Sequence, residues 1–247
     1  MPRIETVLLR VRDPAAQRRF YCDVLGMRYL GRGLVGYGGA EAAIRFLQAD
    51  LPYDPTPRDL YWKIALAVPD IELACAQLAS RGVVVGSPEQ FQDVGYLAHF
   101  RDPEGFAIEL IDHAFKGEGG EVAIDPAQLG GGAHLNLITL RAAEIEPVQS
   151  ACAEWGMTPL SVQPVTDYGF TLYFFGFAPE SPPAADLTAV ENRCWTYQRA
   201  YTVLEVQHVG GAEVAVPMEG RAGYAGVEIT GARGPEVGLM LVGRAES

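Results

Sequence analysis

Positive charge is scarce in this 247-residue chain, which has 19 Lys and Arg residues against 31 Asp and Glu residues and a formal net charge of −12. Such a balance repels nucleic acids and anionic membranes, so the chain is expected to bind neither. No apolar run is long enough to cross a bilayer as a helix. The first residues lack the apolar stretch of a signal peptide, and a cytoplasmic protein is therefore expected.

Cysteine and histidine are also rare, with four of each. The cysteines show no CxxC or zinc-type spacing, and we expect them to be reduced thiols: Cys22, Cys75, Cys152 and Cys194. The histidines are scattered along the chain, and structural roles are expected for them: His99, His113, His134 and His208. The sequence contains no GxxxxGK[ST] phosphate-binding loop, and no cofactor is expected.

The most informative stretch is 102–112, Asp-Pro-Glu-Gly-Phe-Ala-Ile-Glu-Leu-Ile-Asp. Its first four residues predict a tight turn, in which Pro103 presets φ and Asp102 can bond its own backbone. The alternation that follows predicts a strand that carries Glu109 among apolar neighbours. A buried carboxylate needs a partner, so Glu109 is either a salt-bridged or rim carboxylate, or a metal ligand or general base in a cleft.

The order of predicted elements repeats along the chain, which indicates a modular architecture. A strand at 4–11 precedes a helix capped by Asp13, and a strand at 61–68 precedes a helix capped by Asp70, with Lys63 at the position of Thr6. The predicted class is α+β, with tandem βαβββ modules, three complete and the fourth truncated. The predicted domains are 1–115, with modules at about 1–50 and 60–115, and 133–247, with a degenerate last module, joined by a glycine-rich linker at 116–132.

These stretches resemble the vicinal oxygen chelate superfamily, and within it the tandem members of the glyoxalase I, bleomycin-resistance and extradiol-dioxygenase group. The resemblance rests on 6–13, 20–27, 61–70 and 102–112 in the first half, and on 170–177 and 195–208 in the second. It implies the fold and a concave face that binds a small molecule. The superfamily includes lyases, isomerases, dioxygenases and metal-free binding proteins, so the fold alone does not fix the reaction.

The resemblance also implies a metal set, with a His or Gln on the first strand and a Glu on the last strand of each module. It further implies that the first module pairs with the fourth and the second with the third. This chain departs from the pattern, and the residues at those positions are Thr6, Arg45, Lys63, Glu109, Leu137, Glu205 and Tyr224. A fixed cation excludes a metal at Arg45, and two carboxylates beside an ammonium are too few for a closed transition-metal site. No metal is expected.

The expected site lies between the second and third modules and uses Glu109, Glu205 and Lys63 as catalytic residues. The pKa values of two carboxylates near one ammonium move apart. The pKa of one Glu is then raised, which favours its neutral form, while the other Glu pairs with Lys63. Such a pair suits proton transfer beside a carbonyl, or elimination. The prediction is a metal-independent, glyoxalase-like lyase or isomerase, and the residues expected to contact its substrate are Leu137, Thr139, Tyr201, Gln207 and Arg45.

Other functions also fit the sequence. The first is a non-catalytic binding protein, similar to resistance proteins, in which the cleft holds an apolar ligand. The second is a weak-metal lyase or dioxygenase that uses Glu109 and Glu205 with substrate oxygens. A further alternative is that these residues have no catalytic role and form an ion pair that fills a former metal site. The carboxylate pair favours catalysis, and the missing histidines count against a metal enzyme. The expected partner is a small-molecule substrate, and the chain is expected to be a monomer or homodimer.

Overall fold

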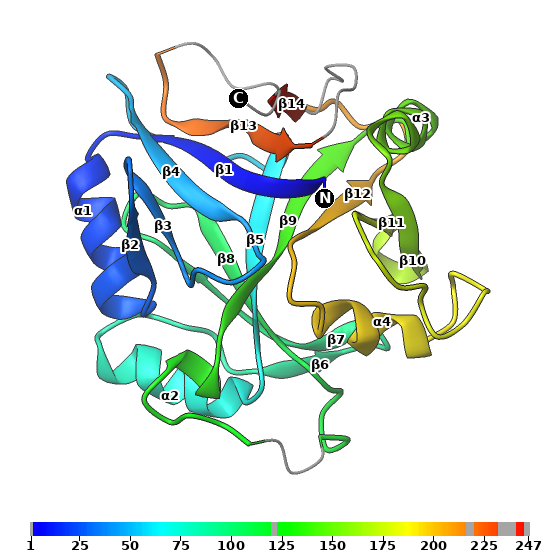
Figure 1. Cartoon of the computed structure of the whole chain (residues 1–247), viewed down its shortest axis with the longest axis horizontal. Helices are drawn as coiled ribbons and strands as arrows, with labels where there is room; N and C mark the ends of the chain where they lie inside the picture. Colours follow the sequence, from blue (N-terminus) through cyan, green and yellow to red (C-terminus); the bar gives the residue numbers. More distant parts are fainter. Residues whose placement is uncertain (1, 120–122, 216–219, 232–240, 245–247) are drawn as a thin grey trace.

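The computed structural model describes residues 2–119, 123–215, 220–231 and 241–244, and its strands form two curved sheets (Figure 1). Within these residues, one sheet has six strands in the order β14-β13-β1-β4-β3-β2. Its strands are β1 (Arg3–Val11), β2 (Arg28–Gly31), β3 (Leu34–Gly36), β4 (Ala43–Gln48), β13 (Gly223–Thr230) and β14 (Leu241–Arg244). The first and last parts of the chain therefore share a sheet.

The second sheet has eight strands among the described residues, in the order β10-β11-β12-β9-β5-β8-β7-β6. They are β5 (Tyr61–Val68), β6 (Glu89–Phe91), β7 (Gly95–Arg101), β8 (Ala107–Asp112), β9 (His134–Ala142), β10 (Thr158–Val165), β11 (Phe170–Gly176) and β12 (Val203–His208). At its centre β5 and β9 run antiparallel, and each pairs in parallel with the last strand of its own segment, β8 or β12. This sheet carries the expected catalytic residues.

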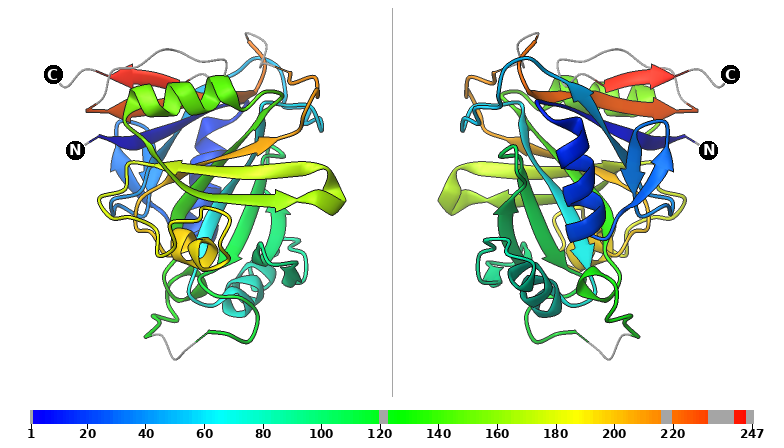
Figure 2. Two further views of the ribbon diagram at one scale, coloured as in Figure 1. Left: turned by 90° about the vertical axis from the view of Figure 1, so that its right-hand side faces the viewer. Right: turned by 90° about the vertical axis from the view of Figure 1, so that its left-hand side faces the viewer.

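Helices cover the outer faces of the sheets, and Figure 2 shows α1 on one side of the molecule and the β10–β11 hairpin on the other. The helices are α1 (Pro14–Arg19), which continues as the π-helical η1 (Phe20–Val24), α2 (Ile71–Ser80), α3 (Glu146–Trp155) and α4 (Glu191–Tyr197), with single turns η2 (Leu129–Gly131) and η3 (Thr166–Tyr168). The predicted caps are confirmed, because Asp13 accepts bonds from two backbone N–H groups of α1 and Asp70 accepts one from Leu73.

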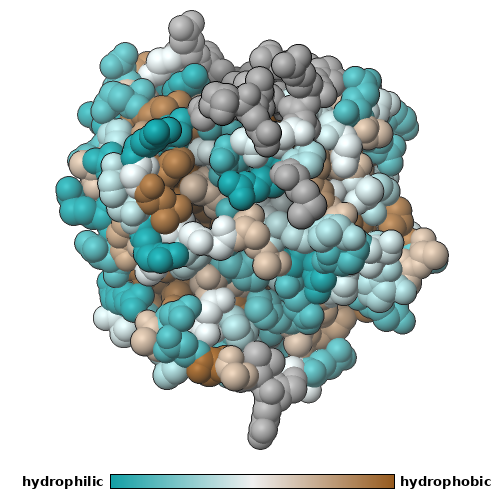
Figure 3. Space-filling model, viewed as in Figure 1, coloured by the Kyte–Doolittle hydropathy of each residue, from teal (hydrophilic) through white to brown (hydrophobic). Residues whose placement is uncertain are grey.

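Polar side chains dominate the surface of the molecule on the face shown in Figure 3. Small apolar patches lie between the polar ones on this face. In the part of the chain that the structure describes, no helix combines the length and the apolar character needed to span a membrane.

Asp102 ties the turn between β7 and β8 to the first helix. Its Oδ1 accepts the backbone N–H groups of Glu104 and Phe106 at 3.0 Å each, as the turn prediction required. Its Oδ2 accepts hydrogen bonds from Gln17 Nε2 at 2.7 Å and from the Tyr21 hydroxyl at 3.0 Å. One buried carboxylate therefore joins the β7–β8 turn of the eight-stranded sheet to the helical segment that packs on β4 of the six-stranded sheet.

We expect Asp102→Ala to lower the free energy of unfolding by about 2 to 3 kcal/mol, because buried donors would lose their acceptor. Denaturant melts measure this loss. Asp186→Ala is the matched control, since Asp186 is exposed and its carboxylate accepts bonds from Thr188, its neighbour along the chain, and it should cost less than about 1 kcal/mol. Equal losses in both variants would mean that Asp102 does not join the two sheets energetically.

Candidate active site

A row of polar side chains crosses five neighbouring strands of the eight-stranded sheet. In register, Glu205 on β12 lies beside Thr139 on β9, and Thr139 lies beside Lys63 on β5. The row continues through Glu109 on β8, which pairs with Ala65, to His99 on β7. Cross-strand neighbours point to the same face of a sheet, so these side chains converge on its concave side.

The Lys63 ammonium lies between the two carboxylates. Its Nζ donates to Glu109 Oε1 at 2.7 Å and to Glu205 Oε2 at 2.9 Å. Lys63 and Glu109 are each 3% exposed, and Glu205 is 2% exposed. Removing one partner from such a buried cluster leaves a charge without compensation, so the three side chains depend on one another.

The two carboxylates differ in their surroundings, and their pKa values shift in opposite directions. Burial raises the pKa of Glu109, but the Lys63 ammonium and the bond from His99 outweigh burial and hold that pKa below its ordinary value. Burial and the nearby charge of Glu109 raise the pKa of Glu205 despite the opposing effect of Lys63. Burial lowers the pKa of Lys63, but the two carboxylates outweigh burial and hold that pKa above its ordinary value, so the ammonium stays charged.

The hydrogen bonds leave one carboxylate oxygen available. Both oxygens of Glu109 are engaged, Oε1 by Lys63 and Oε2 by His99 Nε2 at 2.9 Å. Glu205 accepts both of its bonds, from Lys63 and from the Thr139 hydroxyl, at Oε2. No hydrogen-bond partner for Glu205 Oε1 occurs among the described residues, which makes this oxygen the natural place for a proton to arrive or leave.

His99 belongs to this cluster, although the sequence assigned it a structural role. It faces Glu109 in the β7–β8 pairing, and its side chain is 49% exposed while that of Glu109 is 4% exposed. His99 and Glu109 each stand five residues from Glu104, the centre of the turn at 102–106, so hairpin register could have paired them. The histidine therefore links the buried cluster to solvent.

The cluster forms the floor of a cavity of about 230 Å³. Apolar and aromatic side chains form its walls: Trp62, Phe91, Val94, Leu97, Ile111, Leu137, Tyr168, Phe170, Leu172 and Tyr197. Lys63, His99, Glu109 and Glu205 complete the lining. An apolar cavity with a few convergent polar groups of shifted pKa is typical of a catalytic or binding site.

The residues expected to contact a substrate lie in different places. Leu137 lines the cavity, and Thr139 reaches its floor through Glu205. Gln207 accepts a bond from Arg141 instead, at 3.0 Å. Tyr201 precedes β12, so strand alternation does not apply to it, and it packs against the apolar cluster around Val203. Arg45 belongs to the other sheet, on β4.

Residues predicted for the first and fourth modules meet around Arg45 in the six-stranded sheet. Its Nη1 lies 3.6 Å from Glu228 Oε1, and Glu228 faces Thr6 in the β1–β13 register. The sequence had placed Tyr224 at this position and had missed Glu228. The register of β13 corrects the assignment, because Tyr224 faces Leu9 and stacks on Tyr61 with ring centroids 6.2 Å apart.

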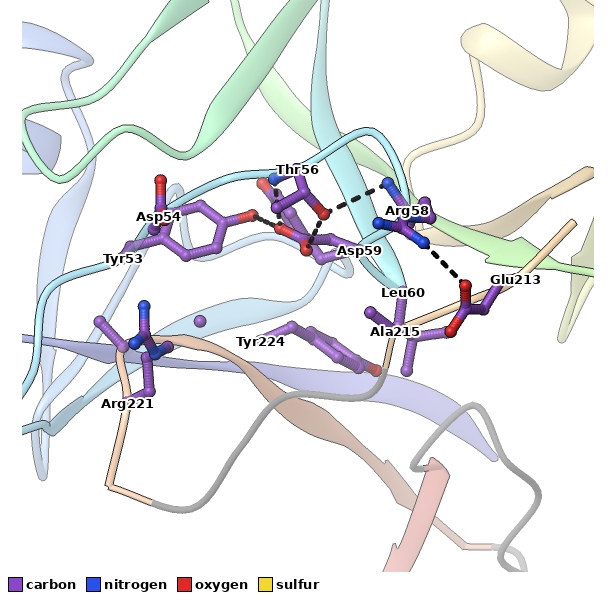
Figure 4. Close-up of a pocket in the computed structure, with 13 residues that line it drawn as sticks. Tyr53, Asp54, Thr56, Arg58, Asp59, Leu60, Glu213, Ala215, Arg221 and Tyr224 are labelled. Atoms are coloured by element: carbon purple, nitrogen blue, oxygen red, sulfur yellow. Dashed lines mark hydrogen bonds and ion pairs between the residues drawn. The ribbon is translucent and has the colours of Figure 1, made fainter.

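A larger cavity of about 500 Å³ lies where the segment after β4 meets the segment before β13 (Figure 4). Its polar side chains largely satisfy one another: both oxygens of Asp59 accept bonds from Tyr53 and Thr56, and Arg58 pairs with Glu213 at 2.7 Å. Two bridges, from Leu51 to Arg221 and from Asp59 to Ala215, join the same segments. We interpret this cavity as a junction, and the smaller cavity as the candidate active site.

A divalent metal does not fit between the two carboxylates. The Lys63 ammonium lies there within hydrogen-bond distance of both, and a metal would have to displace it. Among the described residues, no group of three or more His, Cys, Asp or Glu side chains is arranged to hold an ion. The covalently attached Lys63 ammonium therefore holds the position that a metal ion would need.

The chain is similar to several known proteins. Residues 3–110 match the Glyoxalase/Bleomycin resistance protein/Dioxygenase superfamily. A "Probable lactoylglutathione lyase" from Synechocystis is 31% identical over 124 residues, which cover 44% of this chain and 94% of that protein. A protein of the same name from Vibrio cholerae is 29% identical over 127 residues, which cover 45% of this chain and 91% of that protein.

A solved structure extends the similarity to nearly the whole chain. The crystal structure of glyoxalase I from Zea mays superposes with a TM-score of 0.63 and 20% identity, covering 93% of this chain and 74% of that chain. At this level of identity the likeness concerns the fold, and it confirms the predicted α+β class.

Proposed function

This chain belongs to the Glyoxalase/Bleomycin resistance protein/Dioxygenase superfamily, and from that premise we propose that it is a small-molecule lyase or isomerase that moves a proton by acid/base chemistry. The membership confirms the resemblance found in the sequence. The two relatives named as lactoylglutathione lyases support a glyoxalase-like lyase. One observation carries the finer proposal: the Lys63 ammonium is bound between Glu109 and Glu205 on the floor of an apolar cavity.

Glu205 is the proposed general base, because its Oε1 has no partner in the described part of the chain and its pKa is raised. A base with a raised pKa accepts a proton more readily once it is ionised. Lys63 has three N–H donors, of which the carboxylates take two, and the third can bind a substrate carbonyl oxygen.

The proposed step is removal of a proton by Glu205, and it needs no co-reactant. Glu205 Oε1 takes a proton from the carbon next to the carbonyl, the electron pair of that C–H bond forms a carbon–carbon double bond, and the π pair of the carbonyl moves onto its oxygen. The Lys63 ammonium stabilises the resulting enolate. An isomerase acting on an α-hydroxy carbonyl compound returns the proton to the former carbonyl carbon, while the hydroxyl proton passes to the former carbonyl oxygen. In a lyase the enolate re-forms the carbonyl and a double bond, and the leaving group on the β-carbon departs with the electron pair of its bond.

Glu109 and His99 are proposed to support this step rather than to perform it. Glu109 stays ionised because its pKa is lowered, and it fixes the position of the Lys63 ammonium. His99 donates to the other oxygen of Glu109 and is half exposed, so it orients the carboxylate and connects it to water. Both are positioning residues.

Exchange of a substrate proton for deuterium from the solvent tests the proposal. The protein is incubated in heavy water with small ketones and aldehydes and with S-lactoylglutathione, and magnetic resonance follows the signal of the proton next to the carbonyl. We expect that signal to disappear with at least one compound. Exchange at an unchanged rate in Glu205→Gln would remove Glu205 from the mechanism.

The rate should depend on pH through the ionisation of Glu205. Because its pKa is raised, the base is protonated over a wider acidic range than an ordinary Glu, and below that pKa the rate should fall about tenfold per pH unit. The bond from Thr139 lowers this pKa, so Thr139→Val should move the acidic limb to higher pH. A pH–rate profile of both proteins measures the shift, and a limb that stays in place or moves to lower pH would contradict the assignment.

A binding protein is the second candidate function, and the aromatic lining of the cavity favours it. A protein that only sequesters its ligand needs no proton transfer. In that case the wild-type protein would bind its ligand, and no compound would exchange its proton.

A further inference from the structure

The cavity also indicates which substrate it accepts. We infer that its ligand is an uncharged aromatic carbonyl compound of one or two rings, and that a glutathione adduct does not fit. The inference rests on the proposed function for the location of the site and of the reacting carbonyl. It goes beyond the relatives, whose printed names concern lactoylglutathione.

The size of the cavity limits the ligand. Its volume is about 230 Å³. An apolar cavity of about 150 Å³ is large enough for a benzene ring, and pockets for drug-sized ligands measure roughly 300 to 1,000 Å³. One ring with a short side chain, or two fused rings, therefore fills this cavity, whereas a tripeptide conjugate exceeds it.

Aromatic side chains form a continuous rim that joins both arms of the sheet. Trp62 on β5 contacts Phe170 on β11 with ring centroids 6.0 Å apart, and Phe170 contacts Tyr168 of η3 at 6.3 Å. Tyr168 then contacts Phe91 on β6 at 5.1 Å. Gln92 beside this rim bonds Asp167 across the same gap, at 3.1 Å. The rim thus surrounds the ligand with ring faces and edges, which favour an aromatic partner.

Tyr168 shows that this rim is not simply core. It is 61% exposed although it belongs to the lining of the cavity. Contiguous exposed apolar surface at a groove is typical of a ligand-binding site, and Tyr168 extends the apolar lining of this cavity to the outside. A planar ligand would cover this ring and so bury apolar area.

The charge of the floor excludes anions. The lining has one ammonium and two carboxylates, together with the half-exposed His99. An added carboxylate on the ligand would lie near Glu109 and Glu205 without gaining a free cation, because Lys63 is already shared between them. Glutathione adducts carry two carboxylates. The polar groups lie only on the floor, so the ligand presents a single oxygen there and apolar surface elsewhere.

Ligand binding at equilibrium tests the inference without requiring turnover. Wild-type protein is titrated by calorimetry with acetophenone, cyclohexyl methyl ketone, benzoate and S-methylglutathione. We expect saturable binding of acetophenone, binding of the cyclohexyl ketone that is weaker by about 2- to 10-fold, and no saturable binding of benzoate or S-methylglutathione. Equal affinity of the two ketones, tighter binding of either anion, or no binding of acetophenone would overturn the inference.

Two surface variants place the binding site. Tyr168→Ala should weaken acetophenone binding, whereas Tyr29→Ala should not, although both side chains are 61% exposed and Tyr29 lies in the other sheet. Equal binding in both variants would overturn the role of the rim. Glu205→Gln should still bind acetophenone, so the inferred ligand class can hold even if proton exchange is never observed. Conversely, if only a non-aromatic compound exchanges its proton, the proposed reaction holds and the inferred ligand class is wrong.

Discussion

Lys63→Met should lower the free energy of unfolding by about 3 to 5 kcal/mol, because it leaves two buried carboxylates without their shared cation. Lys63 is 3% exposed and donates to both acids, so water cannot replace it readily. Loss of the ammonium also raises the carboxylate pKa values in the folded state, so the variant should recover part of its stability as the pH falls and the acids bind protons. Denaturant melts at several pH values measure both effects.

Two controls interpret this loss. Lys116→Met removes the other lysine of the chain, which is exposed, and should change stability by less than about 0.5 kcal/mol. The triple variant Lys63→Met, Glu109→Leu, Glu205→Leu removes all three charges together and should be far milder than Lys63→Met alone. Equal, small losses in the single and triple variants would mean that the three residues are solvated in solution and form no common site.

Glu205→Gln should lower turnover by about 10²- to 10⁴-fold while keeping the fold and much of the ligand binding, because the amide cannot accept the proton. Glu109→Gln should also reduce the rate strongly, through misplacement of the Lys63 ammonium. Rate measurements on purified variants decide this.

Arg45→Met is the control for the choice of cavity, since Arg45 pairs with Glu228 in the other sheet. It should cost stability or affinity at most. If Arg45→Met abolishes turnover while both Gln variants stay active, the chemistry belongs to the six-stranded sheet and our choice of site is wrong.

The local parts of the fold followed from the sequence because their causes are local. The strand predicted at 61–68 has those bounds as β5, and the caps at Asp13 and Asp70 hold their helices. Asp102 bonds its own turn as predicted. In each case the decisive interaction spans a few residues, so alternation and capping chemistry were sufficient.

Cross-strand placement was harder to predict. The positions inherited from the resemblance led to Lys63, Glu109 and Glu205, which the structure brings together. His99 was not predicted to join the site because its partner lies on the other strand of the β7–β8 hairpin, and alternation within one strand does not reveal that pairing. Glu228 was missed because the register of β13 depends on its pairing with β1, which is remote in sequence and contains irregularities near Leu8 and Leu9. Alternation gives the face of a strand but not its neighbour.

A titration of the metal-stripped wild-type protein with Mn²⁺ tests the central claim that the Lys63 ammonium fills the cation position between Glu109 and Glu205. Calorimetry should show no stoichiometric binding, and the rate of proton exchange should be the same with and without the ion. Binding of about one Mn²⁺ per chain that Glu109→Gln abolishes, together with exchange that requires the ion, would contradict the account.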